Sequence, residues 1–268
     1  MKIKGSPEHV KFLKRERRTD VLIRLAQIGI LVLFLAVWEL LARYDVIDSF
    51  ITSSPSKILA TFKTLAAEGI WKHIGVTLYE TVLSFVIATI GGTFIAVLLW
   101  FSKIAERISE PYLVVLNSLP KIALGPIIII WVGAGTSAIV VMALLICFII
   151  TIINTLQGFV SVDKDKILLM QTLKANKIQI LLKLVLPANI PNMISCLKIN
   201  VGLTWVGTIM GEYLVSKAGL GFLIVYGGQV FNLSLVMCAT FILCLLSGGM
   251  YAVVALIEKL VYKKYNFN

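Results

Sequence analysis

The chain has 268 residues, of which 59% are hydrophobic and only 15% charged, and its mean hydropathy is +0.94. A soluble domain carries about 45–50% apolar and about 25% charged residues, so the composition excludes a soluble enzyme, a disordered chain and a disulfide scaffold. The net charge of +11 does not indicate nucleic acid binding, because Lys and Arg cluster at the ends of apolar runs, as they do beside membrane helices.

The N-terminal region predicts a first membrane span preceded by a basic tail. Residues 1–24 contain eight Lys or Arg against three acids, and an apolar run without a charged residue follows from Leu25 to Trp38. A signal peptide would have a shorter apolar core and small residues at a cleavage site, whereas this run ends in Trp-Glu-Leu-Leu-Ala-Arg. We therefore expect an uncleaved span with its tail, 1–24, in the cytoplasm.

A mixed segment follows, from Tyr44 to Gly75. Within it, apolar residues recur at helical spacing after Ser54-Pro55-Ser56. This pattern predicts an amphipathic helix that lies along the membrane surface or beside the bundle. Its N-cap is Ser54 or Ser56, because a serine hydroxyl can accept a hydrogen bond from the first helical turn.

The middle of the chain predicts three further spans. No Asp, Glu, Lys or Arg occurs in 81–102 or in 122–162, and about 20 apolar residues suffice to cross a bilayer. The second span, about 77–100, carries Gly91-Gly92, which allows close helix approach. A short loop at 103–110, a third span broken by Pro120 and Pro126 (about 111–132), a hairpin turn at 133–136 and a fourth span at 137–159 then follow in order.

The last part predicts two more spans after a polar interruption. Residues 160–187 carry five Lys, the fifth span occupies about 190–210, and the sixth about 233–257. The uncharged window 218–257 has 40 residues, which as one helix would be about 60 Å long, twice the hydrocarbon thickness. We therefore expect a separate re-entrant or interfacial piece before the sixth span.

Basic residues predict the orientation. With six spans and both termini inside, cytoplasmic segments hold 18 Lys or Arg and external segments hold five, as the positive-inside rule requires. The predicted fold is thus an all-α membrane protein with six transmembrane helices in an N-in/C-in arrangement. One domain covers 25–260, with a short cytoplasmic tail at 261–268.

The polar interruption between spans 4 and 5 is the informative segment. Apolar residues recur every three or four positions on both sides of Lys174-Ala-Asn-Lys177, which predicts a cytoplasmic helix-turn-helix with a basic tip. A loop that only returned the chain to the membrane could be much shorter. The size of the polar interruption therefore favours docking of a soluble partner, and a surface-bound amphipathic hairpin is the alternative.

No catalytic or metal-binding pattern is present in the sequence. The two histidines, His9 and His73, lie outside the predicted spans, and the four cysteines are dispersed in apolar runs. The pair Gly219-x-Gly221 lacks the strand and third glycine of a phosphate-binding loop. The chain therefore moves a solute or binds a partner, and we assign no catalytic residue and no metal ligand.

Prolines and ionisable residues inside spans give candidates for the translocation pathway. Pro120 and Pro126 can open the third helix where it lines a cavity. Lys121 is costly to place in a membrane, so it either attracts an anion to the pathway, extends its ammonium toward the interface, or forms a structural ion pair, with Glu212 as a possible partner. Lys198 lies near the inner end of its span, which favours extension of its ammonium toward the interface.

The polar interruption resembles the ATPase-docking loop of permease subunits of bacterial binding-protein-dependent ABC importers. The family motif is Glu-Ala-Ala, three residues, Gly, nine residues and Ile-x-Leu-Pro. The second half matches from Leu181 to Pro191, with Leu184 in place of the Ile. In the first half, Leu168-Leu169-Met170 replaces Glu-Ala-Ala and Lys174 replaces the Gly.

Further motifs resemble the nitrate, sulfonate and taurine branch of that family. They occur in the expected order over residues from about 50 to 260, and they are Ser54-Pro55-Ser56, Leu119–Pro126, Trp131–Gly135, Leu197–Gly207, Gly211-Glu212 and Gly219–Ile224. The resemblance implies a permease that forms half of the pathway of an ATP-driven importer for a small anion or organic nutrient. A self-contained secondary carrier or channel is the alternative, although no clear repeat supports it.

The resemblance also implies partners and a location. These are a second permease subunit, identical or similar, two ABC ATPase subunits, an extracellular solute-binding protein and the lipid of the bacterial cell membrane, with no nucleic acid. ATP and Mg would bind the ATPase, so no cofactor is expected on this chain. The implied ATPase-coupling residues are Met170, Leu173, Lys174, Ala175, Asn176, Lys177 and Pro187.

Replacement of the motif glycine by Lys174 raises a question of backbone conformation. A left-handed residue other than Gly costs about 1 kcal/mol, and Asn tolerates this conformation better than Lys. We therefore expect the turn to have shifted toward Asn176.

Overall fold

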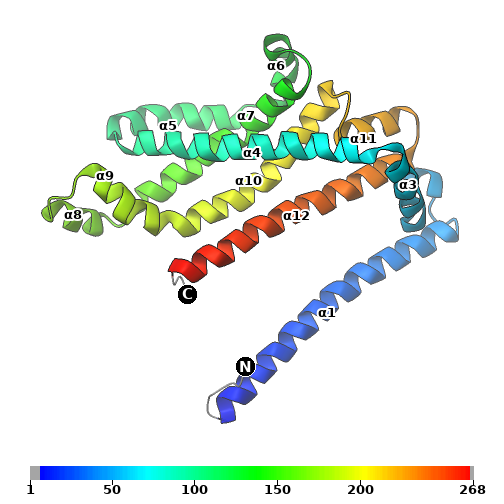
Figure 1. The fold of residues 1–268 in the computed structure, drawn as a ribbon, viewed down its shortest axis with the longest axis horizontal. Helices are drawn as coiled ribbons and strands as arrows, with labels where there is room; N and C mark the ends of the chain where they lie inside the picture. The colour runs from blue at the N-terminus through cyan, green and yellow to red at the C-terminus, as the bar shows by residue number, and fades with distance from the viewer. Residues whose placement is uncertain (1–6, 266–268) are drawn as a thin grey trace. The chain divides into compact units, whose positions relative to one another are not determined.

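The computed structural model describes residues 7–265, and every element in that range is helical (Figure 1). The all-α prediction is therefore confirmed for the described part of the chain. Of the two predicted tails, residues 1–6 and 266–268 lie outside it. The chain divides into two compact units, Met1–Thr64 and Leu65–Asn268.

The first unit contains a long apolar helix followed by two shorter elements. Helix α1 spans Pro7–Arg43, α2 spans Ser49–Thr52, and α3, Pro55–Glu68, begins here. The Ser54 hydroxyl accepts a hydrogen bond from the Lys57 N–H at 3.3 Å, so Ser54 is the N-cap among the two predicted. The Ser56 N–H donates to Glu39 Oε2 at 2.9 Å, which connects α3 to α1.

Three long helices form the core of the second unit: α4 (Ile70–Trp100), α7 (Thr136–Val160) and α10 (Leu186–Val215). Helix α7 packs against both of the others. Glycines set the helix separations, because a Cβ at Gly92 would lie 2.7 Å from Thr151 Cβ, and one at Gly207 would lie 2.6 Å from Ala143 Cα. Such close backbone approach is typical of helix contacts in membranes, and it confirms the role expected of Gly91-Gly92.

The third predicted span is sharply bent. Helix α5 (Lys103–Ser118) is followed by η1 (Lys121–Leu124), a 3₁₀ turn, and by α6 (Gly125–Val132), with a bend of 83° between the two halves. The break lies at Leu119-Pro120, because Pro120 cannot continue a helical hydrogen-bond ladder. Pro126 instead occupies the first turn of α6, where its missing N–H costs nothing, so Pro126 does not break the helix as expected.

Residues 103–110 are helical, and the predicted loop there is wrong. They form the first half of α5, whose N-cap Ser102 accepts from the Ala105 N–H at 3.3 Å. Charged residues at this position lie on one side of an amphipathic helix, so charge alone was a poor sign of a loop. The described residues contain five apolar helices long enough to cross a membrane. They contain six spans if the bent pair formed by α5 and the η1–α6 stretch counts as one.

The C-terminal part contains a short apolar helix before the last span. Helix α11 covers Leu220–Gln229, and α12 covers Leu233–Tyr265. They are separated by a turn in which the Asn232 side chain accepts from the Leu235 N–H at 3.1 Å. The prediction of a separate piece before the sixth span is therefore confirmed.

The connection between α7 and α10 contains three elements that stand at one end of the bundle (Figure 1). They are α8 (Lys164–Thr172), α9 (Lys177–Ile180) and η2 (Leu181–Val185), the last a π-helical turn. Elements α9, η2 and α10 are continuous, so one helical stretch of 39 residues runs from Lys177 to Val215.

Candidate functional site

The coupling segment, defined as Val160–Pro187, contains two helices joined by a turn. Asp163 is the N-cap of α8, and its carboxylate accepts from the Asp165 N–H at 2.9 Å. At its end, the Lys174 N–H donates to Gln171 O at 2.9 Å and the Ala175 N–H donates to Met170 O at 3.0 Å. These two bonds form a Schellman motif, the usual way in which a helix ends at a left-handed residue.

Lys174 itself is the left-handed residue of the turn, with φ 58°. The prediction that the turn had shifted toward Asn176 is therefore wrong. The Schellman bonds fix the left-handed position one residue after the helix C-cap, and Asn176 is two residues too late. Asn176 is extended, with φ −75°, so Lys174 carries the backbone cost that a glycine would avoid.

Asn176 has a different role, as the N-cap of α9. Its side chain accepts from the Gln179 N–H at 2.8 Å, and Gln179 Oε1 accepts from the Asn176 N–H at 2.9 Å. This reciprocal pair is a capping box. The turn is thus held from both sides, by the end of α8 and by the start of α9.

A π-helical turn joins the coupling segment to α10. The Leu186 N–H donates to Leu181 O, a bond from residue i to residue i−5. Pro187 follows directly and lacks an N–H, so the helix cannot form its regular bond there. The wider turn accommodates the proline without ending the helix.

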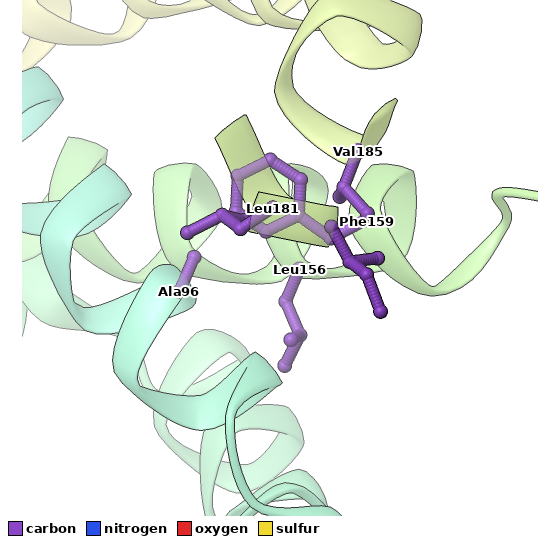
Figure 2. Close-up of a cluster of buried hydrophobic side chains, with 6 residues drawn as sticks. Ala96, Leu156, Phe159, Leu181 and Val185 are labelled. Carbon is purple, nitrogen blue, oxygen red and sulfur yellow. The ribbon is translucent and has the colours of Figure 1, made fainter. Parts of the chain in front are cut away.

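A cluster of buried apolar side chains lies beneath the coupling segment, and we call it the basal cluster. It contains residues from α4, α7 and the start of the 39-residue helical stretch, shown together in Figure 2: Ala96, Leu156, Phe159, Ile180, Leu181 and Val185. Phe159 and Val185 are fully buried. Met170, Ala175 and Leu184 pack against its edge, so the turn rests on the bundle through apolar contacts.

The outer side of the coupling segment is apolar as well, although it is exposed. Five large side chains each expose between 58 and 70% of their surface: Leu168, Leu169, Leu173, Ile178 and Leu182. We call these five residues, together with the exposed Lys174, the docking surface. These exposed apolar groups lie on the two helices that flank the turn, within the polar interruption, and such a group of exposed apolar side chains indicates an interaction site.

The two lysines expected at the tip differ in their surroundings. Lys177 Nζ donates to Phe101 O at 3.1 Å, and Phe101 is the C-cap of α4. A cation at a helix C-terminus satisfies a free carbonyl and the helix dipole. Lys177 therefore holds the segment to α4, whereas the exposed Lys174 side chain belongs to the docking surface.

The pathway candidates Lys121 and Glu212 do not meet. Lys121 Nζ donates to Asn117 O at 2.9 Å and lies 3.4 Å from Asn117 Oδ1, so it stabilises the end of α5 next to Pro120. Among the described residues, the salt bridge found is instead Lys198 Nζ to Glu258 Oε2, at 2.5 Å. That ion pair joins α10 to α12, and the extension of Lys198 toward the interface stays a prediction.

Glu212 lies at the opposite end of α10 from the coupling segment, and it is 1% exposed. Its Oε1 accepts from the Thr77 hydroxyl at 2.6 Å, and its Oε2 accepts from the Gly221 N–H at the start of α11. Thr77 Oγ1 in turn accepts from the Leu220 N–H at 2.8 Å. One carboxylate thus joins α4, α10 and α11.

At the same end of α10, the structure places two further polar side chains, His73 and Glu80, that the sequence analysis did not select. His73 Nδ1 lies 3.0 Å from the Gly219 N atom, and Glu80 of α4 is 1% exposed beside Glu212. The available signal was that Glu80 is an ionisable residue within a predicted span. Within residues 7–265, no three His, Cys, Asp or Glu side chains form a group that could hold a metal ion.

Comparisons with known proteins identify the family to which this helical chain belongs. Residues 88–266 match the family described as "Binding-protein-dependent transport system inner membrane component". The aliphatic sulfonates transport permease protein SsuC of Bacillus subtilis (strain 168) is 27% identical over 233 residues, which cover 87% of this chain and 84% of SsuC. The taurine transport system permease protein TauC of Escherichia coli (strain K12) is 24% identical over 226 residues, 82% of each chain.

A solved structure shares the fold. A chain of the MetNI methionine ABC transporter, in inward-facing conformations, superposes with a TM-score of 0.63 at 20% identity, over 75% of this chain and 98% of that one. At this identity the likeness concerns the arrangement of helices.

Proposed function

The chain belongs to the inner membrane components of binding-protein-dependent transport systems, and we propose that its docking surface is where an ATPase subunit binds and drives it. The chain is a multi-pass permease subunit of an ABC importer in the nitrate, sulfonate and taurine branch. The family assignment replaces the alternative of a self-contained carrier or channel.

The docking proposal is supported chiefly by exposed apolar groups on a well-held turn. Leu173 exposes 70% of its surface, directly before the Schellman turn at Lys174. A turn held by capping bonds on both sides loses little conformational entropy when a partner binds. The exposed ammonium of Lys174 favours an acidic rim on the partner.

A continuous helix offers a route from the docking surface to the other end of the bundle. The stretch from Lys177 to Val215 has 39 residues, about 58 Å at the usual helical rise. A displacement at α9 would therefore move the Glu212 end as well, because a helix without a break transmits motion along its axis. We propose that ATPase closure uses this helix to change the access of the pathway.

The remaining partners belong to the same proposal. Two copies of this chain, or this chain and a similar one, would enclose the pathway with two ATPases beneath them, and an external binding protein would deliver the solute. ATP and Mg would bind the ATPases, and this chain would be non-catalytic. Both termini would lie in the cytoplasm, in agreement with the 18 basic residues in the segments expected inside and the five in those expected outside.

The substrate would be a small anion or organic nutrient, as in the relatives. Among the pathway candidates, Lys121 is half-buried beside the bend at Pro120, where an ammonium could attract an anion. Calorimetry on the binding protein that accompanies this permease, titrated with sulfonates, taurine and nitrate, tests the substrate class. Binding of none of these compounds would contradict it.

Docking is tested by charge reversal and loss of apolar surface on the coupling segment. The double variant Leu173→Ser with Lys174→Glu removes one apolar contact and inverts the local charge, and we expect at least a tenfold loss of co-purified ATPase. The matched control is Lys103→Glu, which inverts another exposed lysine, on α5 and outside the segment. Unchanged co-purification in the double variant, or an equal loss in the control, would contradict the proposal.

A further inference from the structure

Two glutamates meet inside the bundle, where α4 packs against α10, at the end far from the coupling segment. Glu80 and Glu212 are each 1% exposed, and their carboxyl groups are in side-chain hydrogen-bond contact with each other. A hydrogen bond between two carboxyl groups requires a proton on one of them, because an ionised carboxylate can only accept. The importer role of the chain assigns nothing to this pair.

The surroundings of the pair do not neutralise two negative charges. Among the described basic side chains, none forms a salt bridge with Glu80 or Glu212. Two like charges in contact repel strongly where water is excluded, so only one of two touching buried carboxyl groups ionises. The pair therefore holds one proton and carries one negative charge.

The hydrogen bonds of Glu212 indicate that it is the ionised member. Its two oxygens accept from the Thr77 hydroxyl and from the Gly221 N–H. The Thr77 oxygen also accepts from the Leu220 N–H, which leaves the hydroxyl hydrogen for Glu212. A donor on each oxygen stabilises the charged form of a carboxyl group.

Glu80 is the member that lacks donors. Its Oε2 atom is closed to solvent and has no hydrogen-bond partner, so an ionised Glu80 would bury an unsatisfied acceptor. A proton turns this carboxyl group into a donor, and Glu212 is the acceptor beside it. A carboxylate has about four lone-pair sites, so Glu212 can accept a third hydrogen bond.

The groups around the pair are suited to the single negative charge that remains. The Gly221 N–H belongs to the first turn of α11, and the hydroxyl of Thr136, the first residue of α7, interacts with Glu80. Helix N-termini carry partial positive charge. Lys217, which lines a cavity of about 290 Å³ together with Glu80, adds a cation nearby.

We propose that Glu80 and Glu212 form a buried proton-binding site, in which Glu80 holds the proton and donates it to the ionised Glu212. The resulting charge-assisted hydrogen bond joins α4 to α10. When the proton leaves for solvent, two carboxylates face each other and the contact between the helices is weakened. The pair thus makes the end of the bundle that carries Glu212 sensitive to pH.

Infrared spectroscopy of the purified permease detects the proton directly. Exposed carboxyl groups are ionised at about pH 7.5, so in a detergent without ester groups the wild type should show the C=O stretch of one protonated carboxyl group. Glu80→Gln, close to isosteric and able to donate through its amide, should lack this band. The matched control Glu258→Gln removes a carboxylate paired with Lys198 and should keep it. A wild type without the band, or a band that persists in Glu80→Gln, would overturn the proposal.

The dependence of Tm on pH is the second test. The unfolded chain releases the Glu80 proton above about pH 4.3, whereas the folded chain keeps it, so stability falls as pH rises. Between about pH 5 and pH 8, we expect the wild-type Tm to fall by about 4 °C or more relative to that of Glu80→Gln. Parallel curves for the two proteins would contradict the proposal.

The other titratable groups near the pair are distinguished by the same assay. They are His73, which contacts Gly219, Lys217 beside the cavity, and Tyr213 next to Glu212 on α10. A phenol titrates at about pH 10, outside the range measured. A response caused by His73 or Lys217 would persist in Glu80→Gln and disappear in His73→Gln or Lys217→Met. That result would overturn the glutamate pair as the proton-binding site.

Discussion

The two ends of α10 are connected to their neighbours by different interactions. At the coupling segment, apolar side chains of the basal cluster pack together, and two of them, Phe159 and Val185, have no exposed surface. At the other end, Glu212 joins α4 and α11 through hydrogen bonds from Thr77 and Gly221. Apolar packing tolerates small sliding, whereas directed hydrogen bonds fix relative position, so a displacement carried along α10 would move Glu212 together with its partners in α4 and α11.

The largest effect is expected at the basal cluster. Phe159→Ala should lower the free energy of unfolding by about 3–5 kcal/mol, because it leaves a cavity among residues that cannot collapse into it. Denaturant unfolding in detergent measures the loss, and Leu182→Ala, which removes a side chain 58% exposed, serves as control with little change expected. A similar loss in both variants would mean that burial does not hold the segment.

A smaller loss is expected at the polar end. Glu212→Leu should lower the free energy of unfolding by about 3 kcal/mol, because it leaves the buried Thr77 hydroxyl and Gly221 N–H without an acceptor. Glu212→Gln retains an acceptor oxygen and should lose clearly less. Because the two ends are far apart, the losses from Phe159→Ala and Glu212→Leu should add in the double variant. Strong non-additivity would show that the ends are one cooperative unit and would remove the contrast.

The smallest effect concerns the turn. Lys174→Gly should raise stability by about 1 kcal/mol, because glycine adopts the left-handed conformation without a steric cost. Asn176→Ala should lower it by about 1 kcal/mol through loss of the capping box. The shift in Tm measures both changes, and a stabilising effect of glycine at 176 instead of 174 would contradict the assigned turn.

Most of the helices were predictable, and the errors are local. The spans follow from apolar runs, whose length and composition a sequence displays directly. The segment 103–110 was predicted as a loop because its charges were counted without their helical spacing. The turn was assigned to Asn176 from residue preference alone, whereas the Schellman bonds to Met170 and Gln171 place it at Lys174.

The candidate site was predictable in outline only. The polar interruption at 160–187 marked the coupling segment, and the turn within it carries Lys174 and Lys177, as the sequence predicted. The sequence did not distinguish Lys177, which binds Phe101 O, from the exposed Lys174, because these residues are separated from Phe101 by more than 70 positions. Nor did it pair Lys198 with Glu258, since that pairing depends on how α10 and α12 are rotated.

The sequence alone determined that this protein is an all-α membrane protein with one long polar interruption between its apolar spans, because hydropathy and helical periodicity are local properties of the chain. Only the tertiary structure decided which polar and charged groups meet: Glu212 with Thr77 and Gly221, and Lys198 with Glu258. The tertiary structure also decided the 83° bend at Pro120, because a proline permits a bend but packing sets its angle. Contacts between distant segments depend on the rotation and depth of each helix, and no single stretch of sequence contains that information.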